Sequence, residues 1–242
     1  MEIIRGIDII DSGLYIKEEK TLIIGDMHIG YEECLRENGF LLPKFNFGEM
    51  KKRAGKIIDL IDVKKIIING DLKHEFGKIN KDEWSKIKDM IDFIRKKGKV
   101  ILIKGNHDVL LDKIAKKKGL KINNYIKTGD ILITHGDKIP GLLKKKNHIK
   151  TIIISHEHPA VVLKHGIRKE KFRCFLKGKW KSKNLIIMPA FNWLFPGANL
   201  LEGKFLSPFL KETGLKNFNF YIAENKFNSV YDFGKLGDSD IV

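Results

Sequence analysis

The sequence predicts an α/β protein with a single domain, residues 1–242, and three observations support this. Short apolar, mostly β-branched runs recur along the chain, helical patterns lie between several of them, and each run ends at a polar motif. The 242 residues are 43% hydrophobic and 31% charged, which is the composition of a folded chain rather than a disordered one. A chain of this length can bury a sizeable core within one domain.

Five apolar runs are expected to be strands that are buried on both faces. Each contains three or four consecutive apolar residues, most of them β-branched, which is typical of strands in the interior of a parallel sheet. These runs are Thr21–Gly25, Lys65–Gly70, Lys99–Gly105, Ile131–Thr134 and Thr151–Ser155.

Helical patterns separate the earlier runs. Apolar residues recur every three or four positions in Gly48–Asp62 and again in Asn80–Lys97, where Gly98 provides a stop signal. A third helix is expected over Asp108–Lys118, ended by Gly119. Because strands alternate with helices, the first part of the chain is predicted to be α/β.

After His158 the pattern changes to strands without long helices between them. The motif-bearing part is therefore expected to cover residues 21–159 and a mostly β part to cover residues 160–242. The last two predicted strands are expected to pair as a hairpin around residues 224–226. The five later strands are predicted at Ala160–Lys164, Phe172–Leu176, Leu185–Met188, Phe218–Ala223 and Phe227–Phe233.

Residues 184–201 form an uncharged stretch that needs a separate interpretation. Two prolines, Pro189 and Pro196, and Gly197 interrupt it, so a buried strand followed by a loop is expected instead of a membrane span. Its aromatic residues, Phe191, Trp193 and Phe195, can belong to the core, make a contact between two copies of the chain, line the rim of a site or stack on a base. We therefore expect no membrane association and consider a homo-oligomer through this region.

The net charge is strongly positive. The chain has 46 Lys+Arg against 30 Asp+Glu, or +16 with neutral histidine, which favours a polyanionic partner such as DNA or RNA. Only six of the basic residues are arginines, and a lysine-rich composition is also a feature of hyperthermophile proteomes. Charge alone therefore leaves both interpretations open.

The two cysteines, Cys34 and Cys174, lie far apart in the sequence. This excludes a disulfide framework and a thiolate zinc site, and it is consistent with a reducing compartment. We expect a cytoplasmic protein.

The carboxyl ends of the five early runs carry side chains of the kind that bind metals, and this is where α/β proteins usually bind ligands. Imidazole, carboxylate and amide ligands without thiolate suit Mn²⁺, Fe²⁺, Zn²⁺ or Co²⁺. A single histidine would more often be structural, but the set as a whole is not explained that way. Seven ligands exceed the roughly four of one ion, so a two-metal site is expected. They are Asp26, His28, Asp71, Asn106, His135, His156 and His158.

These motifs resemble the five motifs of the calcineurin-like metallophosphoesterases in order and spacing. Three stretches, residues 26–31, 70–74 and 188–191, are similar to the archaeal SbcD-related and the bacterial DNA-ligase-associated phosphoesterases. The resemblance implies a four-layer αββα sandwich with two mixed sheets flanked by helices. The motifs are Asp26-Met27-His28, Gly70-Asp71-Leu72-Lys73-His74, Gly105-Asn106-His107-Asp108, His135-Gly136 and His156-Glu157-His158.

The resemblance also implies which residue binds which ion. Two divalent ions are implied, with Mn²⁺ as the leading expectation and Fe²⁺, Zn²⁺, Co²⁺ or Ni²⁺ as alternatives. Asp71 would bridge both ions. One ion would be held by Asp26, His28 and His158, and the other by Asn106, His135 and His156.

Three further residues receive roles from the resemblance. His107 would contact phosphate and protonate the leaving oxygen, and Asp108 would orient His107. His74 would reach into the site and contact the phosphodiester, as in the nuclease branch of the family. Ser155 departs from the family pattern, which usually has glycine before the His-x-His pair, and its small size should make the change harmless.

The predicted function is therefore a metal-dependent phosphodiesterase, with DNA as the favoured substrate. A hydroxide that bridges the two ions would attack phosphorus in line with the leaving oxygen. The alternative is a phosphodiesterase or phosphatase of small molecules such as cyclic nucleotides, since a fold does not define a substrate.

Overall fold

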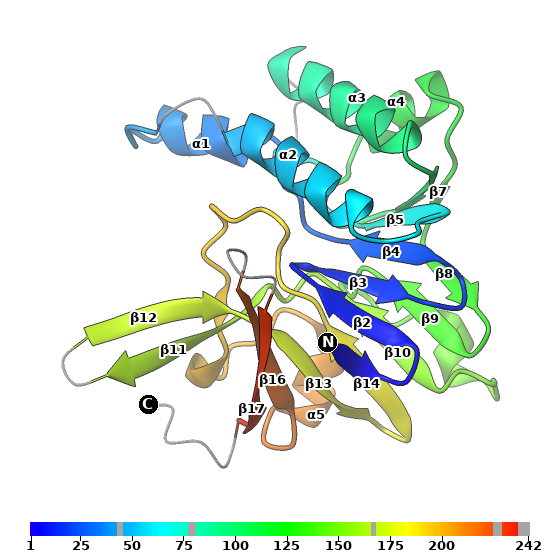
Figure 1. Cartoon of the computed structure of the whole chain (residues 1–242), viewed down its shortest axis with the longest axis vertical. Coiled ribbons are helices and arrows are strands. Elements are labelled where there is room, and N and C mark those ends of the chain that lie inside the picture. Colours follow the sequence, from blue (N-terminus) through cyan, green and yellow to red (C-terminus); the bar gives the residue numbers. More distant parts are fainter. Residues whose placement is uncertain (43–45, 77–80, 166–167, 225–228, 237–242) are drawn as a thin grey trace.

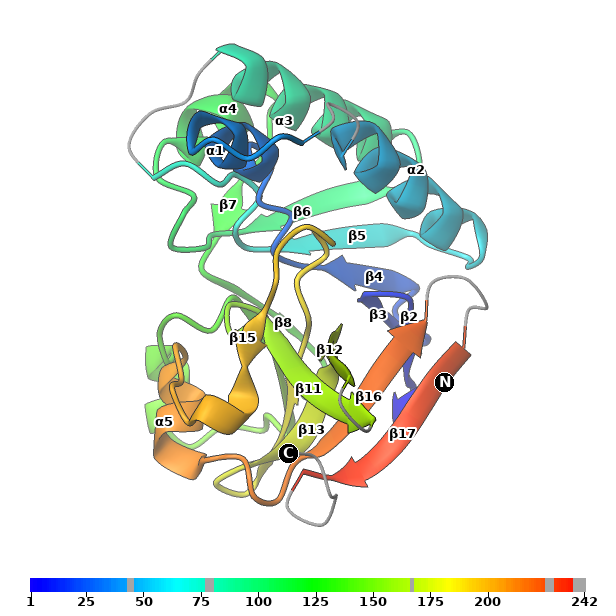
Figure 2. The ribbon, with the colours of Figure 1, turned by 90° about the vertical axis from the view of Figure 1, so that its left-hand side faces the viewer.

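The structure is a computed structural model that describes residues 1–42, 46–76, 81–165, 168–224 and 229–236. Two seven-stranded sheets pack face to face, and helices cover their outer faces (Figures 1 and 2). The predicted α/β class and the four-layer arrangement are confirmed, although the two helical layers differ greatly in size.

The first sheet has its strands in sequence order. Its first four strands pair antiparallel and the last four pair parallel, with β4 shared between the two parts. The strands are β1 (Glu2–Ile4), β2 (Ile7–Ile10), β3 (Gly13–Ile16), β4 (Thr21–Ile24), β5 (Lys65–Asn69), β6 (Lys99–Ile103) and β7 (Ile122–Asn123).

The second sheet is mixed and holds most of the later strands. Its central strands β9, β10 and β14 are parallel, and antiparallel strands continue it on both sides. Its order is β17 (Ser229–Lys235), β16 (Asn219–Glu224), β13 (Phe175–Trp180), β14 (Lys183–Ile187), β10 (Thr151–Ile154), β9 (Ile131–Thr134) and β8 (Tyr125–Thr128). A small third sheet contains β12 (Arg168–Arg173), β11 (Pro159–His165) and β15 (Ala198–Asn199).

Four helices cover the first sheet, and one short helix lies against the second (Figures 1 and 2). The four are α1 (Tyr31–Glu37), α2 (Asn46–Asp59), α3 (Lys81–Arg95) and α4 (Leu111–Lys117), and the short one is α5 (Pro208–Thr213). Within the described residues there are also two 3₁₀ turns, η1 (Gly141–Lys144) and η2 (Leu200–Glu202).

Alternate residues of the central strands face different layers, because successive side chains of a strand point to opposite faces. In β5, Ile66 and Ile68 pack under the helices while Ile67 packs against the second sheet. In β10, Ile153 packs between the sheets while Ile152 and Ile154 face the α5 layer. Since both faces are covered, each isoleucine contributes about 1.5–3 kcal/mol by burial, and this explains the unbroken apolar runs.

The predicted elements agree with the structure except in a few places. The expected Phe172–Leu176 strand is wrong: β12 ends at Arg173 in the small sheet and β13 starts at Phe175 in the second sheet. Between them the Cys174 amide donates to the Pro159 carbonyl at 3.0 Å, so the chain changes sheets there. The predicted hairpin is present as the antiparallel β16–β17 pair, and its turn lies outside the described residues. Strands β1–β3, β7, β8 and β15 and helices α1 and α5 were not predicted.

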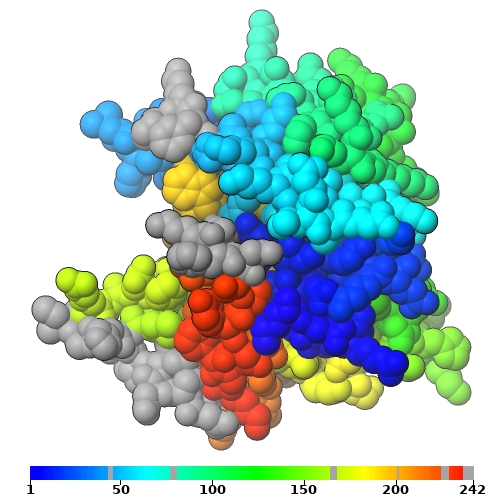
Figure 3. Space-filling model, in the orientation of Figure 1, coloured from blue at the N-terminus to red at the C-terminus, as the bar shows by residue number. Residues whose placement is uncertain are grey.

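The uncharged stretch at residues 184–201 contains buried strand β14 and a loop, as expected. The loop leaves the second sheet and reaches the first, where the Phe191 amide donates to the Gly25 carbonyl at 3.0 Å. Figure 2 shows this gold segment rising between the two halves, and Figure 3 shows part of it at the surface beside α2. Among the described residues, no helix is long and apolar enough to cross a membrane.

Candidate metal centre

The predicted site residues meet where the carboxyl ends of strands from both sheets come together. Strands β4, β5 and β6 of the first sheet end there, as do β9 and β10 of the second. Backbone hydrogen bonds continue past the strand ends, from the Asp26 amide to the Gly70 carbonyl at 3.1 Å and from the Ser155 amide to the His135 carbonyl at 2.9 Å. All ten predicted site residues lie in or beside this centre.

One group of ligand-type side chains is fully enclosed, and we call it the closed cluster. It consists of Asp26, His28, Asp71 and His158, whose ligand atoms all lie within 4.8 Å of one another and which are all buried. The His158 Nε2 atom lies 3.3 Å from the His28 Nε2 atom and 3.3 Å from the Asp26 Oδ2 atom. Two atoms that bind one ion at ~2.1 Å lie about 3.0–3.4 Å apart, so these separations fit a shared metal ion.

A second group shares Asp71 with the first, and we call it the open cluster because two of its members are partly exposed. It consists of Asp71, Asn106, His135 and His156. The His135 Nε2 atom lies 3.0 Å from the Asn106 Oδ1 atom and 3.3 Å from the Asp71 Oδ2 atom. These separations also fit ligands of one ion.

Several buried polar atoms of the centre have no hydrogen-bond partner. Native proteins rarely leave such atoms unsatisfied, and a bound ion often accounts for the exceptions. In His135 the Nδ1 atom lies 3.2 Å from the Asn69 carbonyl. It therefore carries the hydrogen, and Nε2 is left free to bind a metal. The unsatisfied atoms include Asp26 Oδ1, Asp71 Oδ2, His28 Nδ1 and His156 Nδ1.

The electrostatics differ among the histidines. Burial is the main cause that lowers the pKa of His156 to about 3 and holds the pKa of His28 well below its usual range. Burial acts in the same direction on His135, but the charge of Asp71 outweighs it and raises the pKa of His135 to about 10. Burial would raise the pKa of Asp71, yet His135 holds it well below its usual range. His28 and His156 are therefore neutral and ready to bind metal, whereas His135 must release a proton.

The backbone at the centre is held in an uncommon conformation. Five residues of the two clusters have positive φ angles, although such angles are rare for residues other than glycine. Each costs on the order of 1–3 kcal/mol and persists only where the surroundings enforce it, often at functional sites. They are Asp26 (54°), His28 (41°), Asp71 (48°), His156 (64°) and His158 (47°).

Two glycines allow the strand ends to approach closely. A Cβ atom on Gly70 would lie 2.2 Å from the His135 ring, and one on Gly105 would lie 2.1 Å from the Asp71 carboxylate. Gly70 therefore permits a close approach that a residue with a side chain would prevent. Ser155 is also well accommodated, because its buried hydroxyl accepts a hydrogen bond from the side-chain amide of Asn69 at 3.0 Å.

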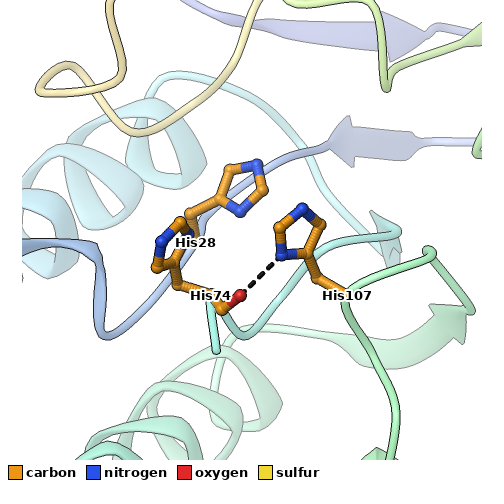
Figure 4. Close-up of side chains that lie close together, drawn as sticks. All are labelled: His28, His74 and His107. Carbon is orange, nitrogen blue, oxygen red and sulfur yellow. Dashed lines mark hydrogen bonds between the residues drawn. The ribbon is translucent and has the colours of Figure 1, made fainter. Parts of the chain in front are cut away.

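His107 and His74 lie beside the closed cluster. Figure 4 shows their rings and that of His28 close together, and one ligand atom from each lies within 4.8 Å of the others. The His107 Nδ1 atom lies 2.5 Å from the His74 carbonyl. Because a carbonyl oxygen can only accept a hydrogen bond, Nδ1 carries the hydrogen. The Nε2 atom of His107 lies 4.0 Å from the Asp71 carboxylate.

The position of Asp108 corrects the expectation that it orients the His107 ring. Its carboxylate is fully buried and accepts hydrogen bonds from the backbone amides of Gly105, Leu72 and Lys73. Asp108 therefore ties the loop after β6 to the loop after β5, and the His74 carbonyl holds the His107 ring instead. Burial also raises the pKa of Asp108 to about 6.

Two buried residues that hold the backbone of His107 and His74 were not predicted from the sequence. Lys73 is fully buried, and its Nζ atom donates to the His107 carbonyl at 3.0 Å. Glu83 of α3 is buried and accepts from the His74 amide at 3.2 Å. Neither residue could be recognised as buried from the sequence, because most lysines and glutamates are exposed.

Aromatic side chains close one side of the centre. Phe195 stacks on the His28 ring at 4.6 Å between centroids and packs edge-on against His158, also at 4.6 Å. Phe76 covers the His107 ring at 3.7 Å. A place at the rim of a site was one of the four possibilities considered for Phe195, whereas Phe76 had no distinguishing signal. His148 is a member of neither cluster and is exposed on the surface.

A family model supplies the deciding observation. The model for calcineurin-like phosphoesterases matches residues 19–179. The chain belongs to the calcineurin-like phosphoesterase family. The protein is accordingly a metal-dependent hydrolase, and the matched residues contain both clusters. No curated protein sequence matches the chain.

One solved structure shows the same fold. This phosphoesterase is similar to the Pseudomonas putida nuclease MPE, with a TM-score of 0.64, 19% identity and 92% of each chain covered. A weaker similarity links it to the E. coli phosphoesterase Yfce, with a TM-score of 0.41, 14% identity, and 85% of this chain and 88% of that chain covered.

Proposed function

We propose that this phosphoesterase is a dinuclear metal-dependent phosphodiesterase that cleaves DNA. The observation that carries the proposal is the pair of ligand clusters that share Asp71. The closed cluster would hold one divalent ion and the open cluster would hold the other. When bound, such ions lower the pKa of water and offset the charge of phosphate oxygens.

The charge of the clusters fits an anionic substrate. Asp26 and Asp71 are the only carboxylates in the two clusters, and the other members are neutral once His135 has lost its proton. Two divalent ions would therefore leave about two positive charges in a largely buried site. A phosphate diester supplies the negative charge that such a site favours.

His107 is proposed as the group that protonates the leaving oxygen. Its Nδ1 hydrogen is committed to the His74 carbonyl, so Nε2 is the nitrogen available to a substrate. In the protonated ring, Nε2–H would donate to the leaving oxygen while the Nδ1 contact keeps the ring in place. Lys73 fixes the same residue through its carbonyl, so both backbone and ring of His107 are positioned.

Three observations favour a nucleic acid as the diester. His74 lies against both His28 and His107, at 5.4 Å and 5.5 Å between ring centroids, which is the place for a contact to the diester. The net charge of +16 attracts polyanions. The similar Pseudomonas putida protein is named as a nuclease.

The ligand side chains indicate which metal the protein uses. Imidazole, carboxylate and amide ligands suit Mn²⁺, which we propose as the working metal.

The cysteines bear on the compartment. Both are free in the structure, in agreement with action in the cytoplasm. Trp193 is the exposed aromatic residue of the 184–201 stretch, at 42% exposure, and any contact between copies through this stretch would involve it.

The test is an activity panel with Mn²⁺. Single-stranded DNA, duplex DNA, RNA, bis-p-nitrophenyl phosphate and cyclic nucleotides are each incubated with the protein and with metal-free protein as the control. Cleavage of DNA that needs the metal is expected. Hydrolysis of the small diesters or cyclic nucleotides without cleavage of any polynucleotide would instead favour a small-molecule phosphodiesterase.

A further inference from the structure

A cleft of about 580 Å³ opens directly from the open cluster. One wall is the loop after β6, with Lys104 and the cluster member Asn106, and the other comes from β8, β9 and the segment that follows β9. We call it the tyrosine cleft, after Tyr125. Its volume falls in the range of about 300–1,000 Å³ that holds small organic ligands.

Tyr125 occupies a defined place in this cleft. It starts β8, the edge strand of the second sheet, and pairs with Thr134 of β9, the residue directly before His135. Its side chain is 40% exposed although it belongs to a regular strand. An exposed aromatic ring that lines the same cleft as the cluster member Asn106 is suited to stack on a planar group of the substrate.

The charges around the cleft complement a phosphate backbone. Lys104 and Lys138 line it, and Lys127 lies on the same exposed face of β8 as Tyr125. Two carboxylates face these cations, with Lys104 lying 3.5 Å from Asp112 and Lys138 lying 3.9 Å from Asp137. Exposed pairs of this kind contribute little to stability, so both lysines can turn to a phosphate at little cost.

We propose that the tyrosine cleft binds the nucleotide next to the scissile phosphate, with its base stacked on Tyr125. This inference rests on the proposed function. A base can stack on a side chain only after it has left its own stack, so the cleft gives a preference for single-stranded over duplex substrate. Its lysines bind the phosphate that follows, which is sequence-independent recognition.

Tyr231 is a matched control for Tyr125. It is also an exposed tyrosine, at 49%, and lies on β17, the opposite edge strand of the same sheet. The two tyrosines thus share residue type, exposure and setting but differ in distance from the centre. The hollow of about 370 Å³ along α2, lined by Arg53 and Trp193, contains no residue of either cluster and is not part of the inference.

The experiment measures kcat/KM with Mn²⁺ for a single-stranded oligothymidylate and for bis-p-nitrophenyl phosphate, in wild type, Tyr125→Ala, Tyr125→Phe and Tyr231→Ala. In Tyr125→Ala the oligonucleotide-to-small-diester ratio should fall about 5- to 100-fold, the loss expected for one stacked base. Tyr125→Phe, which keeps the ring, should restore the ratio to within about twofold. Tyr231→Ala should leave kcat/KM for both substrates unchanged.

An unchanged ratio in Tyr125→Ala would overturn the inference while leaving the proposed function intact, and so would an equal fall in Tyr231→Ala. Failure of the wild type to cleave any oligonucleotide would overturn the proposed function, and the inference with it. The circular dichroism spectrum of each variant shows whether it folds, and Tyr125→Leu replaces Tyr125→Ala if the latter does not.

Discussion

The two ligand clusters differ in how they meet the solvent, although they share Asp71. Every member of the closed cluster is buried, and Phe195 covers it by stacking on His28. In the open cluster, Asn106 and His156 are partly exposed, and Asn106 borders the tyrosine cleft. Under the proposed two-ion function, this difference predicts that the closed cluster would hold its ion firmly and that the open cluster would receive the substrate.

Replacement of the shared residue should have the largest effect. Asp71→Asn removes the charge that both clusters use and that balances His135. Affinity for either ion should fall more than about 10²-fold, since loss of a residue that merely supports a ligand costs about 10- to 100-fold. Metal content after dialysis, measured by atomic emission, checks this. Retention of one tightly bound ion would show that the clusters are independent.

His107→Ala tests a group that lies beside the clusters without belonging to either. Turnover should fall about 10²- to 10⁴-fold, the usual contribution of a proton donor, while metal content equals that of the wild type. Steady-state rates and atomic emission on the same samples give both values. The exposed histidine variant His148→Ala serves as the control and should behave as the wild type. Loss of metal together with turnover in His107→Ala would make His107 a ligand.

Phe195→Ala should open the closed side. Water would then reach His28 and His158, and affinity for the ion of the closed cluster should fall about 10-fold, as for other supporting contacts. Phe195→Leu keeps an apolar cover and should lose less. Calorimetric titration with Mn²⁺ measures the affinity in both variants. An equal loss of affinity at the two clusters, or no loss at either, would contradict the difference between the closed and the open cluster.

The smallest expected effect concerns pH and the metal-free protein. Burial lowers the pKa of His74 to about 4, below the value of about 6.5 in an unfolded chain. Between these values the unfolded state binds more protons, so the stability of the wild type should fall as pH drops from about 6.5 to about 4 and then level off. The urea midpoint of the wild type should therefore decline over this pH range relative to that of His74→Gln, which has no titrating side chain at this position. A difference between the two midpoints that does not change with pH would contradict this prediction.

The sequence carried much of the site but little of its surroundings. The runs that precede Asp26, Asp71 and Asn106 are buried on both faces and therefore appear as unbroken apolar segments, which made their ends easy to locate. Strands β1–β3 have a less distinct pattern, since residues such as Asp8 and Tyr15 are only half-buried and interrupt the apolar run.

Contacts between distant segments were beyond local patterns. Phe195 meets His28 only because the loop after β14 crosses from one sheet to the other. Asp108 sits in a motif beside His107, yet its partners are backbone amides of another loop. Such pairings depend on how the sheets stack, and residue spacing along the chain does not encode it.

The most direct test of the shared-aspartate centre is the number of Mn²⁺ ions that restore activity. Metal-free wild type, prepared with a chelator, is titrated with Mn²⁺ while binding and cleavage of single-stranded DNA are followed on the same sample. The two clusters predict two ions per chain, with cleavage returning only as the second binds. Full cleavage with a single ion bound would contradict the account.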